Sequence, residues 1–356
     1  MLLTDAENPA RSLEALEEFA ARTRLEAVET YRATLDATLA LLSQTDGLLS
    51  LPALPTLIIP DLHARRELLI AILGTQLSDG PHEGQHVFEL LQQGHINLVC
   101  VGDIVHSEKR ADWVINEDGE WTEELLEKEM VRSLGAGMMI MSLKLQYPEH
   151  FHCLRGNHDD MAGELVEDFR KFVGLRYAND ELVFVDGRPV VTGDKGESKI
   201  VREWVLGREG WGQSFLTAWS TFEKRLPLFA RGSYYVISHT LPFIALSESD
   251  IRDPDRPRES SLELTTRRGI NEAAILGTLE NLGLKEQTRR WFYGHSQVSS
   301  EINGGRYEEG LNGLVIRLNN PTQHVFAYVP DSDDQQLFEP ARDVYIKTPG
   351  EEQFHQ

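Results

Sequence analysis

The sequence is poor in cysteine and has no long apolar stretch, and each shortage excludes a class of protein. Cys100 and Cys153 are the only cysteines among 356 residues, and both lie inside apolar runs. We therefore expect buried free thiols in a reducing compartment and no disulfide framework. No apolar run approaches membrane-spanning length, and the first residues lack the basic segment of a secretory signal. These features predict a cytoplasmic protein with no membrane partner.

Basic residues are also scarce relative to acidic ones. Lysine and arginine total 35, aspartate and glutamate total 57, and the formal net charge is −22. Such a surface repels polyanions at long range, so we expect no nucleic-acid partner. A hydrophobic fraction of 41% is enough for a sizeable core.

Polar motifs follow five apolar, strand-like runs at the points where the runs end. Each motif begins with a glycine, proline or serine and continues with Asp, Asn or His. We expect five strands to deliver these side chains at their C-terminal ends. The chemistry-bearing side chains are Asp61, His63, Asp103, His106, Asn157, His158, His239 and His295.

These residue types point to a metal centre. Asp, Asn and His ligate borderline-hard divalent metals, and the lack of a cysteine cluster argues against a structural zinc site. Six such ligands exceed the need of one ion, so we expect two ions that share Asp103. Asp61 and His63 would complete one site, and Asn157, His239 and His295 the other.

The predicted centre is suited to phosphate chemistry. Two divalent cations outweigh two carboxylates, so the site attracts an oxyanion despite the acidic surface. A hydroxide held between the ions would attack phosphorus in line. His158 stands one residue beyond a ligand and is the expected general acid that protonates the leaving oxygen.

The remaining segments predict an α/β protein with a helical N-terminal extension. Residues 1–50 form this extension, whose helix at about 12–46 either packs on the main domain or mediates oligomerisation. The catalytic domain spans 51–330, and 331–356 form a polar tail. Within the domain we expect helices at about 65–77, 122–146 and 271–282, a helical elaboration at 160–225, exposed loops at 108–120 and 250–268, and a hairpin-like pair at 314–318 and 325–329.

Two segments resemble those of a known family, the calcineurin-like phosphoprotein phosphatases. They run from Leu143 to Asp159 and from Phe222 to Pro242, and the likeness covers roughly Leu57 to Val329. The resemblance implies a four-layer metallophosphatase fold, with a central β-sandwich flanked by helices. It also implies two ions of manganese, iron or zinc on the six ligands above, His158 as catalytic acid, and a phosphorylated protein or small molecule as substrate.

The sequence departs from the family beside the proposed chemistry. The second motif of the family contains Asp-Arg-Gly, in which the Asp orients the catalytic histidine and the Arg grips phosphate, but here the run begins with His106. His106 therefore either donates to the phosphate or shares a proton with His158. Thr240 and Leu241 replace a Gly-Gly pair after the fourth-motif histidine. Replacement phosphate clamps are Arg155, Arg65, Arg66, Arg267 and Arg268.

Three functions remain open at this point. The first is hydrolysis of phosphomonoesters, including phosphoserine and phosphothreonine on proteins. The second is hydrolysis of a nucleotide or dinucleoside polyphosphate, which would explain the altered second motif. The third is a regulatory or scaffold protein that retains metal with impaired turnover. For Arg155 the competing interpretation is a structural salt bridge.

Overall fold

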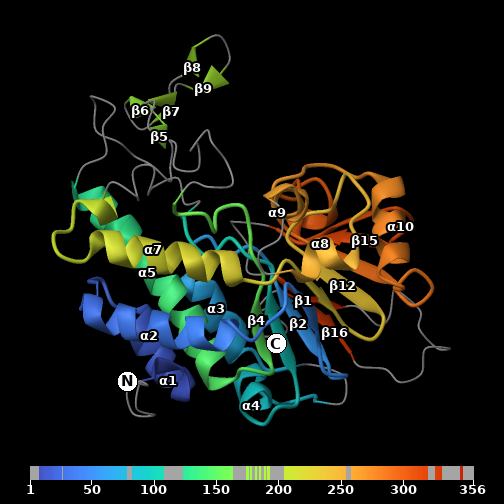
Figure 1. The fold of residues 1–356 in the computed structure, drawn as a ribbon, viewed down its shortest axis with the longest axis horizontal. Helices are drawn as coiled ribbons and strands as arrows, with labels where there is room; N and C mark the ends of the chain where they lie inside the picture. Colours follow the sequence, from blue (N-terminus) through green and yellow to red (C-terminus); the bar gives the residue numbers. More distant parts are fainter. Residues whose placement is uncertain are drawn as a thin grey trace, which may run out of the picture.

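The computed structural model is a β-sandwich between two helical layers (Figure 1). It describes residues 8–25, 27–77, 82–107, 123–162, 204–253, 258–319 and 325–330, with short strands between 174 and 192 and at 345–347. The two main sheets share an apolar core, and each has a second core on its outer, helix-covered face. The expected α/β class and four-layer arrangement are confirmed.

One sheet has the strand order β17-β16-β2-β3-β4. Strands β2, β3 and β4 are parallel neighbours, and every position in them is buried. Alternate side chains explain this burial, since Ile58 points into the sandwich while Leu57 and Ile59 face the helices. The strands are β2 (Thr56–Ile59), β3 (Asn97–Cys100), β4 (Phe151–Cys153), β16 (Phe326–Val329) and β17 (Tyr345–Lys347).

The other sheet has the order β1-β11-β12-β13-β15-β14, and its central strands β12 and β13 are parallel. Three helices form the layer over this sheet, seen on the right of Figure 1. The strands are β1 (Leu48–Ser50), β11 (Phe229–Arg231), β12 (Tyr235–Ser238), β13 (Arg290–Tyr293), β14 (Glu308–Gly310) and β15 (Val315–Arg317), and the helices are α8 (Glu248–Arg252), α9 (Arg258–Thr265) and α10 (Glu272–Asn281).

The opposite helical layer contains the long helix α5, whose methionines belong to the core. Met130, Met138 and Met141 are all buried in it. The layer is made of α1 (Leu13–Ala20), α2 (Val28–Leu42), α3 (Arg66–Gly74), α4 (Val87–Gln92), α5 (Glu123–Gln146) and α7 (Gly212–Arg225), with a short 3₁₀ turn at Pro9–Arg11.

The N-terminal segment differs from the prediction of one helix over residues 12–46. Helix α1 ends at Ala20 and α2 starts at Val28, because α1 packs on α3 whereas α2 packs on α5 and α7. The segment then enters the sandwich, since β1 pairs in parallel with β11. Strand β1, which lies just before Pro52 and Pro55, was not predicted.

Three further predictions were wrong in part. Residues 250–268 contain α8 and α9 rather than an exposed loop, and one face of α9 is buried. The two closing strands do not pair, since β15 joins β13 and β14 while β16 joins β2 and β17. The predicted helical elaboration at 160–225 includes short strand pairs as well as α7. Within the segment 331–356, β17 pairs with β16. The loop predicted at 108–120 lies outside the described residues.

The structure also bears on the two cysteines and on membrane-spanning segments. Both cysteines are free and buried, as predicted. Among the described helices, none combines the length and the apolar character that a membrane span requires.

Candidate metal centre

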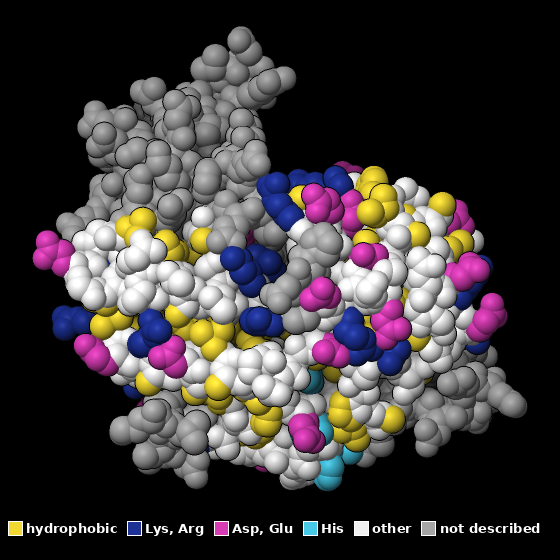
Figure 2. All heavy atoms as spheres, viewed as in Figure 1, with side chains coloured by type: hydrophobic (Ala, Val, Ile, Leu, Met, Phe, Trp, Pro, Cys, Tyr) yellow, Lys and Arg dark blue, Asp and Glu magenta, His cyan; other side chains and the backbone are white. Residues whose placement is uncertain are grey.

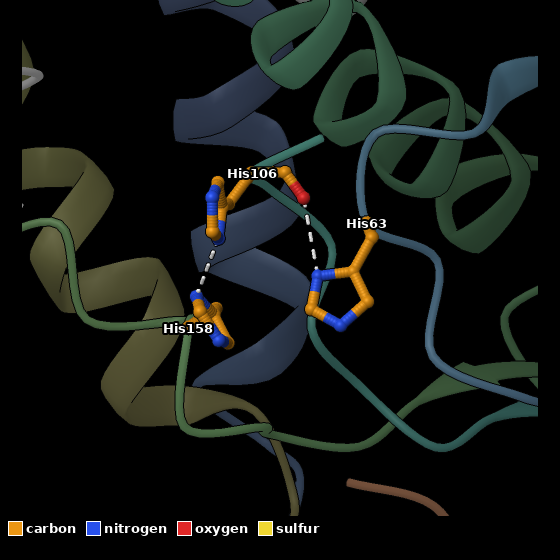
Figure 3. Close-up of side chains that lie close together, drawn as sticks. All are labelled: His63, His106 and His158. Carbon is orange, nitrogen blue, oxygen red and sulfur yellow. Dashed lines mark hydrogen bonds between the residues drawn. The ribbon is translucent and has the colours of Figure 1, made fainter. Parts of the chain in front are cut away.

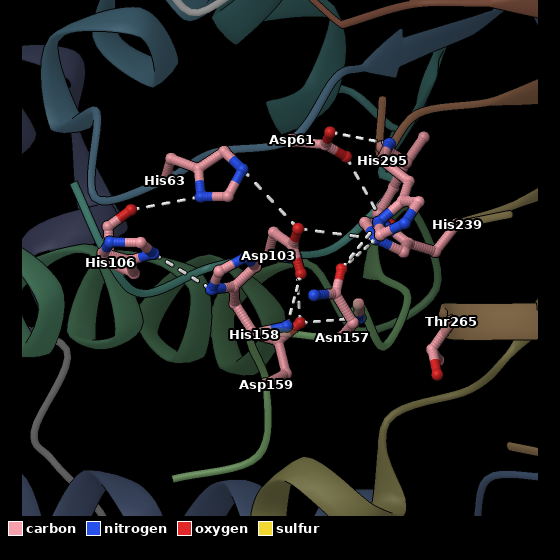
Figure 4. Close-up of polar contacts among 12 residues, drawn as sticks. Asp61, His63, Asp103, His106, Asn157, His158, Asp159, His239, Thr265 and His295 are labelled. Carbon is pink, nitrogen blue, oxygen red and sulfur yellow. Dashed lines mark hydrogen bonds and ion pairs between the residues drawn. The ribbon is translucent and has the colours of Figure 1, made fainter. Parts of the chain in front are cut away.

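The polar motifs meet where five strands end. β2, β3 and β4 are parallel in one sheet and β12 and β13 are parallel in the other, so each set of carboxyl ends lies at one sheet edge. Figure 4 shows the side chains of all five motifs pointing toward a common centre, with Asp103 in the middle. The structure therefore brings together every ligand and catalytic histidine that the sequence suggested.

Asp103 links the two halves of the cluster. Its Oδ2 atom lies 3.5 Å from His63 Nε2 and 3.4 Å from His239 Nε2. Its Oδ1 atom accepts the backbone N–H of His158 at 2.7 Å. Neighbouring ligand atoms around one first-row metal ion are about 3 Å apart when each bond is about 2.1 Å. Asp103 is thus placed to ligate on both sides.

The two histidines beside Asp103 are oriented by backbone carbonyls. His63 Nδ1 lies 3.1 Å from the carbonyl oxygen of His106, and His239 Nδ1 lies 3.0 Å from that of Val101. A carbonyl only accepts, so each Nδ1 carries the proton and donates. Nε2 of each ring then carries the lone pair and faces Asp103 Oδ2, the usual arrangement of a metal-binding histidine.

The other half of the cluster surrounds Asn157 Oδ1. This oxygen lies 3.1 Å from His239 Nε2 and 2.7 Å from His295 Nδ1. Asp61 joins the group because its Oδ2 atom accepts the backbone N–H of His295 at 2.7 Å. Asp61 Oδ1 is fully buried and accepts no well-formed hydrogen bond from the described residues, since its neighbour His239 Nδ1, 3.4 Å away, donates to the carbonyl oxygen of Val101 at 3.0 Å. A bound cation would satisfy this oxygen, so the donor set and its geometry fit a metal.

The electrostatics also favour a bound cation. Burial raises the pKa of Asp103, although His239 and His63 partly offset this effect. Burial alone would lower the pKa of His239, but Asp103 and Asp61 outweigh it and raise the pKa to about 9. The two carboxylates thus draw positive charge to the point between them. A divalent ion on the same atoms would supply that charge.

The backbone of the motifs is shaped around the carboxylates. A Cβ added to Gly156 would lie 2.1 Å from Asp103 Oδ1, and one added to Gly294 would lie 2.3 Å from Asp61 Oδ1. His63, Asp103 and His295 themselves have φ of 44°, 51° and 67°. Such left-handed conformations are unfavourable for non-glycine residues by about 1 kcal/mol or more, and they concentrate at functional sites.

His106 and His158 form a pair of imidazoles beside the cluster (Figure 3). Their Nδ1 atoms lie 3.0 Å apart. One nitrogen must donate and the other accept, so one proton lies between the rings. This geometry favours the second alternative for His106, in which it shares a proton with His158. Helix α5 anchors the pair, because Ser133 Oγ accepts the N–H of His106 at 2.9 Å.

No protein-family model and no curated protein matches the sequence. A protein serine/threonine phosphatase from Saccharomyces cerevisiae, itself similar to human phosphatase PP5, matches in structure with a TM-score of 0.55 over 91% of this chain and 90% of that one, at 13% identity. The chain has the calcineurin-like phosphatase fold. The comparison therefore confirms the fold that the motifs predicted.

Two other solved structures are less similar to this chain. One is to a protein named as a candidate diadenosine tetraphosphatase, with a TM-score of 0.39, 15% identity, and 85% of this chain and 98% of that one covered. The other is to a cold-active protein-tyrosine phosphatase of a psychrophilic Shewanella, with a TM-score of 0.42, 12% identity, and 81% and 79% covered.

Two of the five arginines predicted to bind phosphate, Arg65 and Arg155, are buried and bonded to backbone carbonyl oxygens. Arg65 is buried and donates to the carbonyl oxygens of Leu62 and Asp61. Arg155 is buried and donates to the carbonyl oxygen of Asp159 at 3.1 Å. Arg155 Nη2 also lies 3.8 Å from Asp160 Oδ1, in agreement with the structural salt bridge that was the alternative for this residue. Both side chains brace the motif loops in this structure.

Of the remaining arginines, Arg268 lies at the cluster, Arg267 pairs with α9, and Arg66 faces the helical layer. Arg267 is half exposed and binds Glu263 through Nε at 2.7 Å. Arg268 donates from Nε to His295 Nε2 at 3.2 Å, so its guanidinium lies at the cluster itself. Arg66 donates to the carbonyl oxygen of Arg22 on the helical side.

Sequence reasoning gave no role to Asp159, which organises two of the motif loops. Its carboxylate accepts the N–H groups of Asp103 at 2.9 Å, Ile104 at 2.8 Å and Gly156 at 2.7 Å. Burial and the nearby Asp103 raise the pKa of Asp159 to about 6. The sequence signal for its role was its place in the third motif, two residues after Asn157. Glu129 on α5, which accepts the N–H of Ser107 at 3.1 Å, gave no such signal because it lies in a regular helix.

Proposed function

We propose that the protein is a metal-dependent phosphatase that hydrolyses phosphomonoesters at a binuclear centre. The position of Asp103 carries the proposal. Two three-residue groups share it, Asp61 with His63 on one side and His239 with His295 on the other, and the ligand atoms of each group lie within 4.8 Å of one another. A carboxylate common to two such groups is suited to a pair of ions, and these donors suit manganese, iron or zinc.

The chain's own residues account for the remaining steps. When bound, the two ions would supply a Lewis-acid site that activates water and stabilises charge on the phosphoryl oxygens. His158 is held by Asp103 through its backbone and by His106 through Nδ1, and we assign its Nε2 the protonation of the leaving oxygen. Arg268 carries further N–H donors beyond the one on His295, and these bind a phosphoryl oxygen.

The test combines metal content with hydrolysis of phenyl phosphate and p-nitrophenyl phosphate after loading with manganese. We expect two metal ions per chain, and loss of metal and activity in Asp103→Asn. His158→Ala should lose about 10²- to 10⁴-fold with phenyl phosphate and less with the better p-nitrophenolate leaving group. His106→Ala should lose activity in the same pattern. Asp36→Asn, at an exposed carboxylate on α2 that pairs with Arg32, is the matched control and should change neither.

The outcomes separate the candidate functions. Bound metal without turnover of either ester would favour the regulatory or scaffold alternative. Protein without metal after loading would contradict the proposal. A near-normal rate of His158→Ala on phenyl phosphate would remove the role given to that side chain. Phosphoserine and phosphothreonine peptides, tested next, would show whether proteins are substrates.

A further inference from the structure

Three large apolar side chains are exposed close to the candidate metal centre. Phe243 is 38% exposed, Ile244 54% and Ile270 45%, and we call them the apolar rim. Exposed apolar side chains that gather beside a polar site mark a binding surface more often than single scattered ones do. In the described part of the chain, Leu206 and Ile302 have comparable exposure.

The rim adjoins the centre through two loops. Phe243 follows the candidate ligand His239 by four residues, and a Cβ added to Gly269 would lie 3.5 Å from its Cζ atom. Gly269 itself stands between Ile270 and Arg268, whose guanidinium reaches His295 at 3.2 Å. The apolar rim is therefore adjacent to Arg268 and to the proposed phosphate site.

A buried carboxylate fixes the rim in place. Glu263 on α9 is 2% exposed, and its Oε2 atom accepts the N–H groups of Phe243 at 2.7 Å and Ile244 at 3.3 Å. The second loop is tied to the first, since Asn271 Nδ2 donates to the carbonyl oxygen of Phe243 at 3.0 Å. These bonds use the buried Glu263 to hold two apolar side chains in solvent. The surface is thus preorganised to bind.

The charges around the rim restrict what it binds. Figure 2 shows Lys and Arg side chains gathered over α9, with hydrophobic side chains along the same edge of the molecule. Arg267 is paired with Glu263, and Arg268 contacts His295. Within the described residues of the two rim loops, 240–247 and 266–271, the cationic side chains are Arg267 and Arg268, and both already have partners. Further phosphates of a polyphosphate chain that lay against Phe243, Ile244 or Ile270 would thus gain little from these loops. This environment disfavours nucleotide polyphosphates, because desolvated phosphates need charged donors.

We propose that the rim binds the organic group of the substrate, and that the substrate is a phosphate monoester of an aryl or aliphatic group. The phosphate lies at the metal centre and Arg268, and the apolar group packs on Phe243, Ile244 and Ile270. This inference rests on the proposed phosphatase function and names its substrate class. Thr240 and Leu241, which replace the family's Gly-Gly pair, lead directly into this loop.

The test compares two esters with leaving groups of similar acidity, phenyl phosphate and 2-naphthyl phosphate, on manganese-loaded protein. We expect kcat/KM to favour 2-naphthyl phosphate about fivefold in the wild type, chiefly through KM, since one further ring becomes half buried. In the triple variant Phe243→Ser, Ile244→Ser, Ile270→Ser this preference should be lost, with kcat/KM on 2-naphthyl phosphate falling to the value on phenyl phosphate. Leu206→Ser, which changes an equally exposed side chain on another surface, should keep the preference.

A binding measurement supplies a readout that does not depend on turnover. Calorimetry with benzylphosphonate and 2-naphthylmethylphosphonate should show the same fivefold preference and its loss in the triple variant. Hydrolysis of both esters without a preference, or a preference unchanged in the triple variant, would overturn the role of the rim. Hydrolysis of neither ester would contradict the phosphatase function itself, so the two failures are distinguishable.

Discussion

The pair His152 and Lys144 predicts that acid destabilises the strand that leads to Asn157 and His158. His152 lies on β4 and is almost fully buried, with Nδ1 accepting from Lys144 Nζ at 3.1 Å and Nε2 donating to the carbonyl oxygen of Glu149 at 3.1 Å. Both ring nitrogens are therefore used in the neutral form. Protonation would place a second positive charge directly against the ammonium group of Lys144.

The size of the effect follows from the shift in pKa. Burial, reinforced by Lys144, lowers the pKa of His152 from 6.5 to about 3. Below pH 6.5, His152 is therefore protonated in the unfolded chain but stays neutral in the folded chain. The free energy of unfolding falls as the pH decreases from 6.5 toward 3. Between pH 7 and pH 4 the loss is about 3 kcal/mol from this one side chain.

Urea unfolding of the metal-free wild type and His152→Asn, at several pH values from 4 to 7, measures this contribution. The two proteins share every other titrating group, so the difference between their unfolding free energies should shrink by about 3 kcal/mol as the pH falls. Lys144→Met should show a weaker pH dependence than the wild type, with part remaining because burial is the larger cause. A difference that is constant over this pH range would refute the reasoning.

Two further substitutions test the shape and the support of the site. Gly156→Ala should expel Asp103 from its position and abolish metal binding, as measured by metal analysis, because the new Cβ would lie 2.4 Å from the Asp103 nitrogen; Gly74→Ala, whose Cβ would meet its nearest neighbour at 3.6 Å, should retain metal. Glu129→Ala should lower the unfolding free energy by about 1–3 kcal/mol, since it leaves a buried backbone N–H without its acceptor. Glu124→Ala, at an exposed carboxylate on the same helix, should change it by less than about 0.5 kcal/mol, and equal losses in the two glutamate variants would contradict the proposed support.

The motif loops were predictable because their signal is local. An apolar run that ends in a small residue and then a ligand-type side chain specifies both a strand and the polar group at its end, as Ile59 and Asp61 illustrate. The uniformly apolar composition of β2 also suits its burial on both faces. The five loops form one site because neighbouring parallel strands place their carboxyl ends at the same edge of a sheet.

The failures concern features that tertiary contacts decide. β15 and β16 have similar apolar patterns, yet they lie in different sheets, and no local property of either distinguishes the two. α9 was missed because polar Ser260, Ser261 and Glu263 occupy part of its buried face, so it has no clear apolar period. Arg268 could not be separated from Arg267 by sequence, since adjacent residues on a short segment point to different partners.

The departures from the calcineurin-like motifs lie beside the proposed acid His158 and beside the apolar rim, and we assign them two separate roles. His106 contacts the proposed acid His158, so its substitution affects the proton that every leaving group receives. The loop after Thr240 leads to the apolar rim, so its substitution has the larger effect on leaving groups that bury more apolar surface there. Variants of His106 should therefore slow phenyl and 2-naphthyl phosphate equally, whereas variants of the rim should slow 2-naphthyl phosphate more than phenyl phosphate. If both sets of variants changed the two esters in the same proportion, the assignment of proton transfer and recognition to separate residues would be wrong.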